Sequence, residues 1–318
     1  MKIVANFEQD LKNQIKKNIL FLSNNIHTQN LKKEFDLNNN TYWKKPIQHI
    51  LIDYYNFMDR LIPEIPMKVV LTKNLKDSIY YKTYQYKINE IEKLFTLGKP
   101  VNEYLSSKHK KQYKFKDRLY QLLGIHHLHL GDLSPDGKKI SRSDNLLILQ
   151  IDHKNCIVYF LDIVSHKDFT KETINYYKYV NILVKEDLLK NNEYLFVLSN
   201  TDNSHKENSL TEEEYRRLVS KNFTVPINIG NTTIVPRARA GDSKGGSVII
   251  NACYYAEDVM HIVKFYEKMY SNIIGVHSLF KENLGMYPAS VTQCKVNIHF
   301  PNLDLKHGIK ISLSITIL

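Results

Sequence analysis

Three short apolar runs in the middle of the chain constrain the fold more than any other feature of the sequence. They span residues 125–130, 145–153 and 156–164, and each connection between them carries turn-forming residues, such as Pro135-Asp136-Gly137 in the first. Apolar runs of this length between turn signals are typical of β-strands, and strands joined in this way pair in antiparallel order. The sequence therefore predicts an antiparallel meander at the centre of the protein.

The region before the meander has the periodicity of α-helices. Apolar residues spaced four apart form one stripe of a first helix, namely Phe7, Leu11, Ile15 and Ile19. A second helix is predicted to begin near Pro46 and to end before Pro63, because proline is favoured in the first turn of a helix and stops it elsewhere. Further elements are predicted as a strand at 67–72 and helices at 84–97, 100–106 and 112–123, the last ended by Gly124.

The region after the meander mixes helices and strands. A helix at 172–189, a strand at 194–198 and a polar linker at 201–209 come first. Thr211 and Glu214 form the pattern of a capping box, which predicts a helix from there to about Lys221. Later elements are predicted as strands at 225–229 and 232–236, a helix at 252–266, and two alternating strands at 294–300 and 309–317.

These patterns predict an α+β protein in three parts. Residues 1–110 form a mainly helical N-terminal region, residues 111–205 form a central α+β core in which helices flank an antiparallel sheet, and residues 206–318 form a small C-terminal α+β unit.

The chain carries 44 Lys and Arg against 33 Asp and Glu, a formal net charge of +11. A positive balance favours a polyanionic partner, which in a cell is most often RNA or another nucleic acid. The alternative is that the charge reflects an AT-rich genome, since the chain is also rich in Lys, Asn, Ile and Tyr.

The cysteines, and the lengths of the apolar segments, indicate the cellular compartment of the protein. Cys156, Cys253 and Cys294 are odd in number and far apart, which argues against a disulfide framework, a zinc ribbon and an iron–sulfur site and suits a reducing compartment. The N-terminus lacks the apolar core of a secretory signal, and no run approaches the roughly 18 apolar residues of a spanning helix. We therefore expect a soluble, cytoplasmic protein with no membrane partner.

The first strand of the meander carries the most informative residues, Gly-Ile-His-His-Leu-His-Leu at 124–130. Residues two apart on a strand share a face, so His127 and His129 point the same way. The same meander carries three further candidates, which antiparallel pairing can bring close to these imidazoles: Arg142, His166 and Lys167. We predict these five residues as the catalytic set.

Cleavage of RNA by its own 2′-hydroxyl suits such a set. One imidazole removes the 2′ proton, a second protonates the departing 5′ oxygen, and a fixed cation such as Arg142 stabilises the charged phosphate. His166 or Lys167 would serve as a further proton donor or cation. No cofactor and no metal ion are required.

Two other interpretations of the histidines stay open. The imidazoles can be strand residues with purely structural partners. Alternatively, His127, His129 and Asp132 can bind zinc, although the chain lacks the additional histidine of the His-x-His-x-Asp-His pattern found in metallo-hydrolases.

A basic segment directly before the histidines is a predicted nucleic-acid contact. Lys111, Lys114 and Arg118 lie on one face of the predicted helix, interleaved with aromatic residues such as Tyr113 and Phe115. Cations at this spacing can contact successive phosphates. The alternative is a solvated lysine face on a helix whose apolar side lies in the core.

A second basic segment contains Arg237, Arg239 and Lys244 among the glycines of residues 241–246. Backbone N–H groups of a glycine-rich loop, with cations beside them, can hold a phosphate. The Gly-Lys-Ser/Thr order of a nucleotide-hydrolysing P-loop is missing, so ATP hydrolysis is not predicted. The alternative is a surface loop without a ligand.

Two blocks of sequence carry a resemblance, GIHHLHLG and RSDNLLILQIDHKNCIVYFLDIVSHKDF. They resemble an uncharacterised prokaryotic family built around the same histidine segment. Over residues 112–169 the meander is also similar in pattern to RelE-like toxins and to the wider barnase–EndoU–colicin–RelE group of ribonucleases. That resemblance implies a RelE-like sheet and a metal-independent endoribonuclease, toxic to its own cell or to an infecting phage, with an antitoxin or a phage component as partner.

The sequence therefore leads to one expected function with two alternatives. We expect an endoribonuclease-like effector of a toxin or phage-defence system, with sheet-borne histidines as acid and base. The first alternative is a non-catalytic protein that binds or senses nucleic acid. The second is a scaffold whose positive charge reflects genome composition alone.

Overall fold

The computed structural model describes residues 3–4, 7–25, 35–37, 41–106, 117–134, 140–141, 143–170, 173–190, 192, 194–199, 210–221, 223–230, 232–236, 240–241, 247–248, 256–257, 260–261, 264 and 316–317. The chain divides into two compact units, one of Met1–Asp59 with Asn251–Leu318 and the other of Arg60–Ile250. The divisions predicted from the sequence, at residues 110 and 205, both fall inside the second unit.

The first unit contains two amphipathic helices, α1 (Phe7–Asn25) and α3 (Ile47–Met58). The stripe predicted on α1 is buried at Leu11, Ile15 and Ile19, and Pro46 is the N-cap of α3. The helical turn η1 (Tyr42–Lys44) precedes α3. Strand β1 (Ile3–Val4) pairs antiparallel with β11 (Thr316–Ile317). The rest of the two terminal strands predicted at 294–300 and 309–317 lies outside the described residues.

A four-stranded sheet forms the centre of the second unit. Its strands are β2 (Lys68–Leu71), β3 (Ile125–His129), β4 (Asn145–Asp152) and β5 (Ile157–Ser165), in the order β2-β5-β4-β3. The α+β class and the antiparallel meander β3-β4-β5 are confirmed. The sheet as a whole is mixed, because β2 joins it parallel to β5. The strand predicted at 67–72 thus belongs to the same sheet as the histidines.

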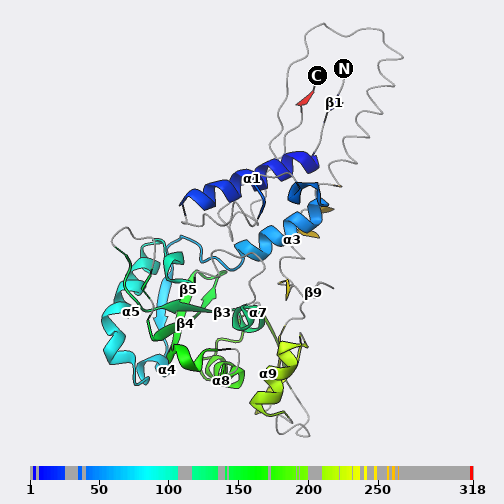
Figure 1. Ribbon diagram of the computed structural model, residues 1–318. Coiled ribbons are helices and arrows are strands. Elements are labelled where there is room, and N and C mark those ends of the chain that lie inside the picture. Colours follow the sequence, from blue (N-terminus) through cyan, green and yellow to red (C-terminus); the bar gives the residue numbers. More distant parts are fainter. Residues whose placement is uncertain are drawn as a thin grey trace, which may run out of the picture. The chain divides into compact units, whose positions relative to one another are not determined.

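Helices cover both faces of this sheet, which places β4 in the core. All eight residues of β4 are buried. One face packs with α7 (Arg118–Leu123), α8 (Tyr176–Lys185) and α9 (Glu212–Ser220). The other packs with α5 (Tyr81–Thr96) and the turn η2 (Asn102–Tyr104) (Figure 1). We call these the α8 face and the α5 face.

A β-bulge in β5 changes which residues reach each face. Ile148 lies opposite Asp162, whereas the next residue of β4, Leu149, lies opposite Phe160. Leu161 is therefore the extra residue, and it packs in the α8-face core, whereas Phe160 packs in the α5-face core. The bulge brings Asp162 to the α8 face, where its Oδ2 lies 2.7 Å from Lys178 Nζ of α8.

Two local predictions about helix ends are confirmed. Thr211 and Glu214 form a complete capping box at the start of α9. Gly124 ends α7 with a φ of +67°, and its N–H donates to the carbonyl of Tyr120. A Cβ at Gly124 would lie 2.3 Å from the ring of Tyr194, so both the backbone conformation and the space demand glycine.

The remaining elements of the second unit are short. They are α4 (Lys73–Lys76), η3 (His166–Asp168), β6 (Leu195–Ser199), β7 (Ile227–Ile229), β8 (Thr232–Pro236), β9 (Ala240–Gly241) and β10 (Ser247–Val248). Strands β6, β8 and β7 form a separate antiparallel sheet in that order, and β9 pairs with β10. Within the described residues, no helix has the length and apolar character needed to cross a membrane.

Candidate active site

Strand β3 presents two imidazoles on the α8 face, as the alternation of the strand predicts. The ring centroids of His127 and His129 lie 6.5 Å apart. His127 pairs in register with Ile148 of β4, and His129 pairs with Leu146. Ile148 and Leu146 both belong to the α8-face core. The prediction that these two histidines share one face of the sheet is therefore confirmed.

A third imidazole joins them from the end of β5. His166 begins η3, and its backbone N–H donates to the carbonyl of Asp144 at 2.6 Å, which holds the turn beside the start of β4. The His166 ring stacks on His129 with a centroid distance of 5.8 Å and an interplanar angle of 30°. We call His127, His129 and His166 the imidazole row.

The imidazole row runs from the protein interior to its surface. His127 is only 9% exposed, His129 is half-buried, and His166 is exposed. The ring of Phe169, which follows η3, lies 4.8 Å from the His127 ring. His166 is therefore the ring most exposed to solvent, His129 is partly covered, and His127 lies in the interior.

Asp117 orients the buried end of the row, and sequence reasoning missed it. Its Oδ1 accepts from the backbone N–H of Tyr120 and so caps α7, while its Oδ2 lies 3.3 Å from His127 Nδ1. A proton on Nδ1 that faces a carboxylate leaves the lone pair of a neutral imidazole on Nε2. The signal in the sequence was an aspartate directly before a helix, which is a strong N-cap pattern but gives no hint of the histidine.

Of the basic residues predicted for the site, the structure describes two, and they differ in exposure and in contacts. Lys167 lies exposed on η3, next to His166. The guanidinium of Arg118 donates to the carbonyls of Val219 and Ser220, the latter at 2.9 Å, and so binds the C-terminal end of α9. Arg118 is thus engaged within the protein. The other predicted cations lie outside the described residues: Lys111, Lys114, Arg142, Arg237, Arg239 and Lys244.

Asp132, the third member of the alternative zinc set, contacts a lysine. Its carboxylate lies 3.0 Å from Lys87 Nζ, which also lies 2.8 Å from a carboxylate oxygen of Glu90. The Tyr104 hydroxyl donates to the other Glu90 oxygen at 2.6 Å. Burial opposes ionisation of Glu90, but the hydrogen bonds from Lys87 and Tyr104 outweigh it and lower the pKa of Glu90.

Burial likewise disfavours the charged form of Lys87, yet its two carboxylate partners outweigh that effect and raise the pKa of Lys87. These side chains therefore form a charged network that ties α5 to the residues after β3. Across the part of the chain that the structure describes, no three His, Cys, Asp or Glu side chains are arranged to hold a metal ion.

Comparison of the chain with known proteins identifies no relative whose functional site could be compared with this one. No family model, no curated protein and no solved structure matches the chain. A proposal about the function therefore rests on the imidazole row and its surroundings alone.

Proposed function

We propose that this protein is a metal-independent endoribonuclease that cleaves RNA through the 2′-hydroxyl of the substrate. The observation that carries the proposal is the contiguous imidazole row, which runs from the nearly buried His127 through the half-buried His129 to the exposed His166. Imidazole can accept or donate a proton near neutral pH, so two adjacent rings can supply both the base and the acid that this reaction needs. As the sequence resemblance implies, the proposed setting is a cytoplasmic toxin or phage-defence system, with an antitoxin or a phage component as partner.

In the proposed reaction, His129 and His166 act directly on the substrate. One ring takes the 2′ proton while the 2′ oxygen attacks phosphorus, and the other gives a proton to the 5′ oxygen as its bond to phosphorus breaks. The products are a 2′,3′-cyclic phosphate and a free 5′-hydroxyl. Lys167, exposed beside His166, is the proposed cation for the negative charge on the phosphate, together with Arg142.

His127 and Asp117 act as positioning residues in this proposal. His127 is nearly buried, and the contact of its Nδ1 with Asp117 fixes the orientation of the ring behind His129. The arrangement is that of a carboxylate that orients an imidazole through the nitrogen facing away from the substrate.

A cleavage assay with a chemical control tests the proposal. The purified protein is incubated with a single-stranded oligoribonucleotide in EDTA, beside the same oligonucleotide with 2′-O-methyl groups. We expect cleavage of the ribose form only, with cyclic phosphate ends identified by mass spectrometry, because the methylated form lacks the attacking hydroxyl. Cleavage of the methylated form, or no cleavage of either, would contradict the proposal.

Substitution of Asp117 separates its two contacts. Asn at position 117 keeps a side-chain oxygen that can cap α7, whereas Ala loses both the cap and the contact with His127. We expect Asp117→Asn to keep most of the stability and Asp117→Ala to lose about 1 kcal/mol of unfolding free energy. Both variants should cut RNA at least about tenfold more slowly through a lower kcat, since a misplaced ring is costly. Urea unfolding and steady-state kinetics measure the two effects, and a wild-type kcat for Asp117→Asn would refute the positioning role.

A further inference from the structure

Helix α5 carries a stripe of three side chains that contact the meander where its strands end. They are Tyr80, Tyr84 and Lys87, which lie four and then three residues apart and so share one face of the helix. Tyr80 is the N-cap, and its carbonyl accepts from the backbone N–H of Tyr84 at 3.1 Å, which places it in helical register. We call these three residues the α5 stripe.

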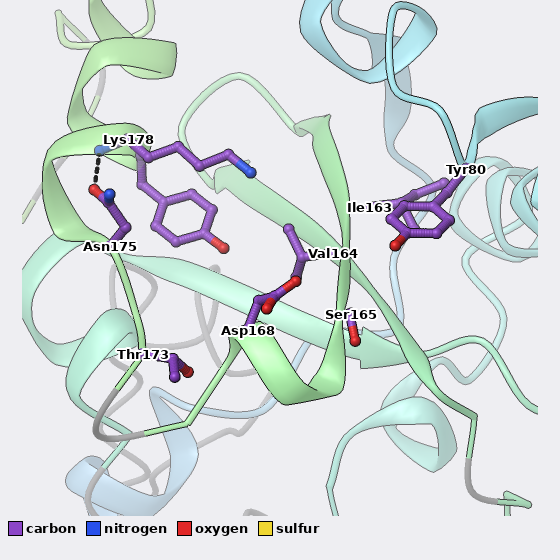
Figure 2. Close-up of a pocket in the computed structure, with 9 residues that line it drawn as sticks. Tyr80, Ile163, Val164, Ser165, Asp168, Thr173, Asn175 and Lys178 are labelled. Atoms are coloured by element: carbon purple, nitrogen blue, oxygen red, sulfur yellow. Dashed lines mark hydrogen bonds between the residues drawn. The ribbon is translucent and has the colours of Figure 1, made fainter.

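The two ends of the α5 stripe contact the outer strands of the meander. Tyr80 lines a small pocket with Ile163 and Ser165 at the C-terminal end of β5 (Figure 2). Lys87 Nζ lies 3.0 Å from the carboxylate of Asp132, which follows the C-terminal end of β3. The stripe therefore spans the same end of the sheet from β5 to β3.

The middle of the α5 stripe contacts β4, the strand between them. Asn145, the first residue of β4, donates from Nδ2 to the Tyr84 hydroxyl at 2.8 Å. Asn145 is only 8% exposed, and its neighbour Leu146 packs in the α8-face core, so the Asn145 side chain points to the α5 face. Tyr84 thus holds the start of β4 from the face opposite the imidazoles.

The backbone of Asn145 joins the two strand ends that carry the outer imidazoles. It pairs in register with Ser165, the residue directly before His166. Its carbonyl accepts from the N–H of Leu130, the residue directly after His129, at 3.4 Å. The position of this one residue therefore affects where both rings leave the sheet.

We propose that the Tyr84 hydroxyl positions the outer imidazoles, His129 and His166, by fixing Asn145. The inference rests on the proposed function and adds a positioning residue to it. Without the hydroxyl, the nearly buried amide of Asn145 loses this partner, which is costly, and a shift of the strand start towards another partner relieves the cost. Misplacement of reacting groups by about 1 Å can lower a rate about 10²-fold.

Side-chain NMR of the histidines tests the inference without any need for cleavage. Tyr84→Phe keeps the ring and removes only the hydroxyl, and Tyr86→Phe, at a tyrosine of the same helix that is 79% exposed, is the matched control. In long-range proton–nitrogen correlation spectra of the full-length protein, we expect the signals of His129 and His166 to shift in Tyr84→Phe. They should coincide with those of the wild type in Tyr86→Phe, and the signal of His49, in the other unit, should shift in neither.

Cleavage kinetics give a second measurement. Tyr84→Phe should lower kcat for the oligoribonucleotide about tenfold and leave KM unchanged, because the hydroxyl acts on the reacting groups through Asn145. Tyr86→Phe should keep the wild-type kcat. In a double-mutant cycle, Tyr84→Phe together with Asn145→Ala should lower kcat no further than Asn145→Ala alone, since both substitutions remove the same hydrogen bond.

The outcomes separate this inference from the proposed function. Unchanged His129 and His166 signals in Tyr84→Phe overturn the inference even if RNA is cut. Additive effects in the double-mutant cycle, or a higher KM at an unchanged kcat, also overturn it. If the two signals shift as expected but the wild-type protein never cuts RNA, the proposed function fails, whereas the positioning of the imidazoles by Tyr84 stands.

Discussion

Replacement of both His129 and His166 by asparagine is expected to lower the rate of RNA cleavage by about 10³-fold or more. The two rings stack at 5.8 Å at the outer end of the imidazole row, and they are the pair proposed as base and acid. Each single variant should cost nearly as much as the double variant, because residues that act as a unit are not additive. Single-turnover cleavage of an oligoribonucleotide in EDTA measures the effect.

The controls for this prediction separate chemistry from binding and folding. His49→Asn changes an exposed histidine of α3 in the other unit and should leave the rate unchanged. The double variant should still bind the uncleavable 2′-O-methyl oligonucleotide with wild-type affinity and keep its circular dichroism spectrum. If the double variant cut RNA at the wild-type rate, the imidazole row would have no role in the cleavage reaction.

Phe160→Ala is expected to destabilise the second unit by about 3–5 kcal/mol, as removal of a fully buried phenylalanine usually does. Phe160 lies in β5 with no exposed surface, and its ring packs edge-on against Phe95 of α5 at a centroid distance of 5.8 Å. The loss combines the transfer energy of the ring, the cavity it leaves and the aromatic contact. Urea unfolding followed by circular dichroism measures the change in midpoint.

The matched control is Phe196→Ala, at an exposed phenylalanine in β6. Its side chain is 51% exposed, so truncation should shift the unfolding free energy by no more than about 0.5 kcal/mol. If the two substitutions lowered the free energy of unfolding equally, the packing of the four-stranded sheet against α5 would not be a main source of the stability of the second unit.

The local features of the fold could be predicted because each depends on a few neighbouring residues. The alternation of β3 placed His127 and His129 on one face, and the residues around Gly124 and Thr211 gave a helix end and a helix start. These predictions need only the period of a strand and the hydrogen-bonding needs of helix ends.

The features that depend on distant pairing could not be predicted. Strand β2 joins β5 in parallel from some 90 positions away, and nothing in its four residues specifies that partner or direction. The bulge that brings Asp162 to the α8 face depends on the pairing of β4 with β5. The contact of Asp117 with His127 and the binding of Arg118 to α9 both need the folded arrangement of helices around the sheet.

The division of the chain into two units affects the order in which they can fold during synthesis on the ribosome. The second unit is one continuous stretch, Arg60–Ile250, whereas the first is assembled from segments on both sides of it. Domains generally fold as units while synthesis proceeds from the N-terminus. The unit with the histidines can therefore complete its sheet while the ribosome is still translating, whereas β1 must wait for β11, more than 300 codons later, before it has a strand to pair with.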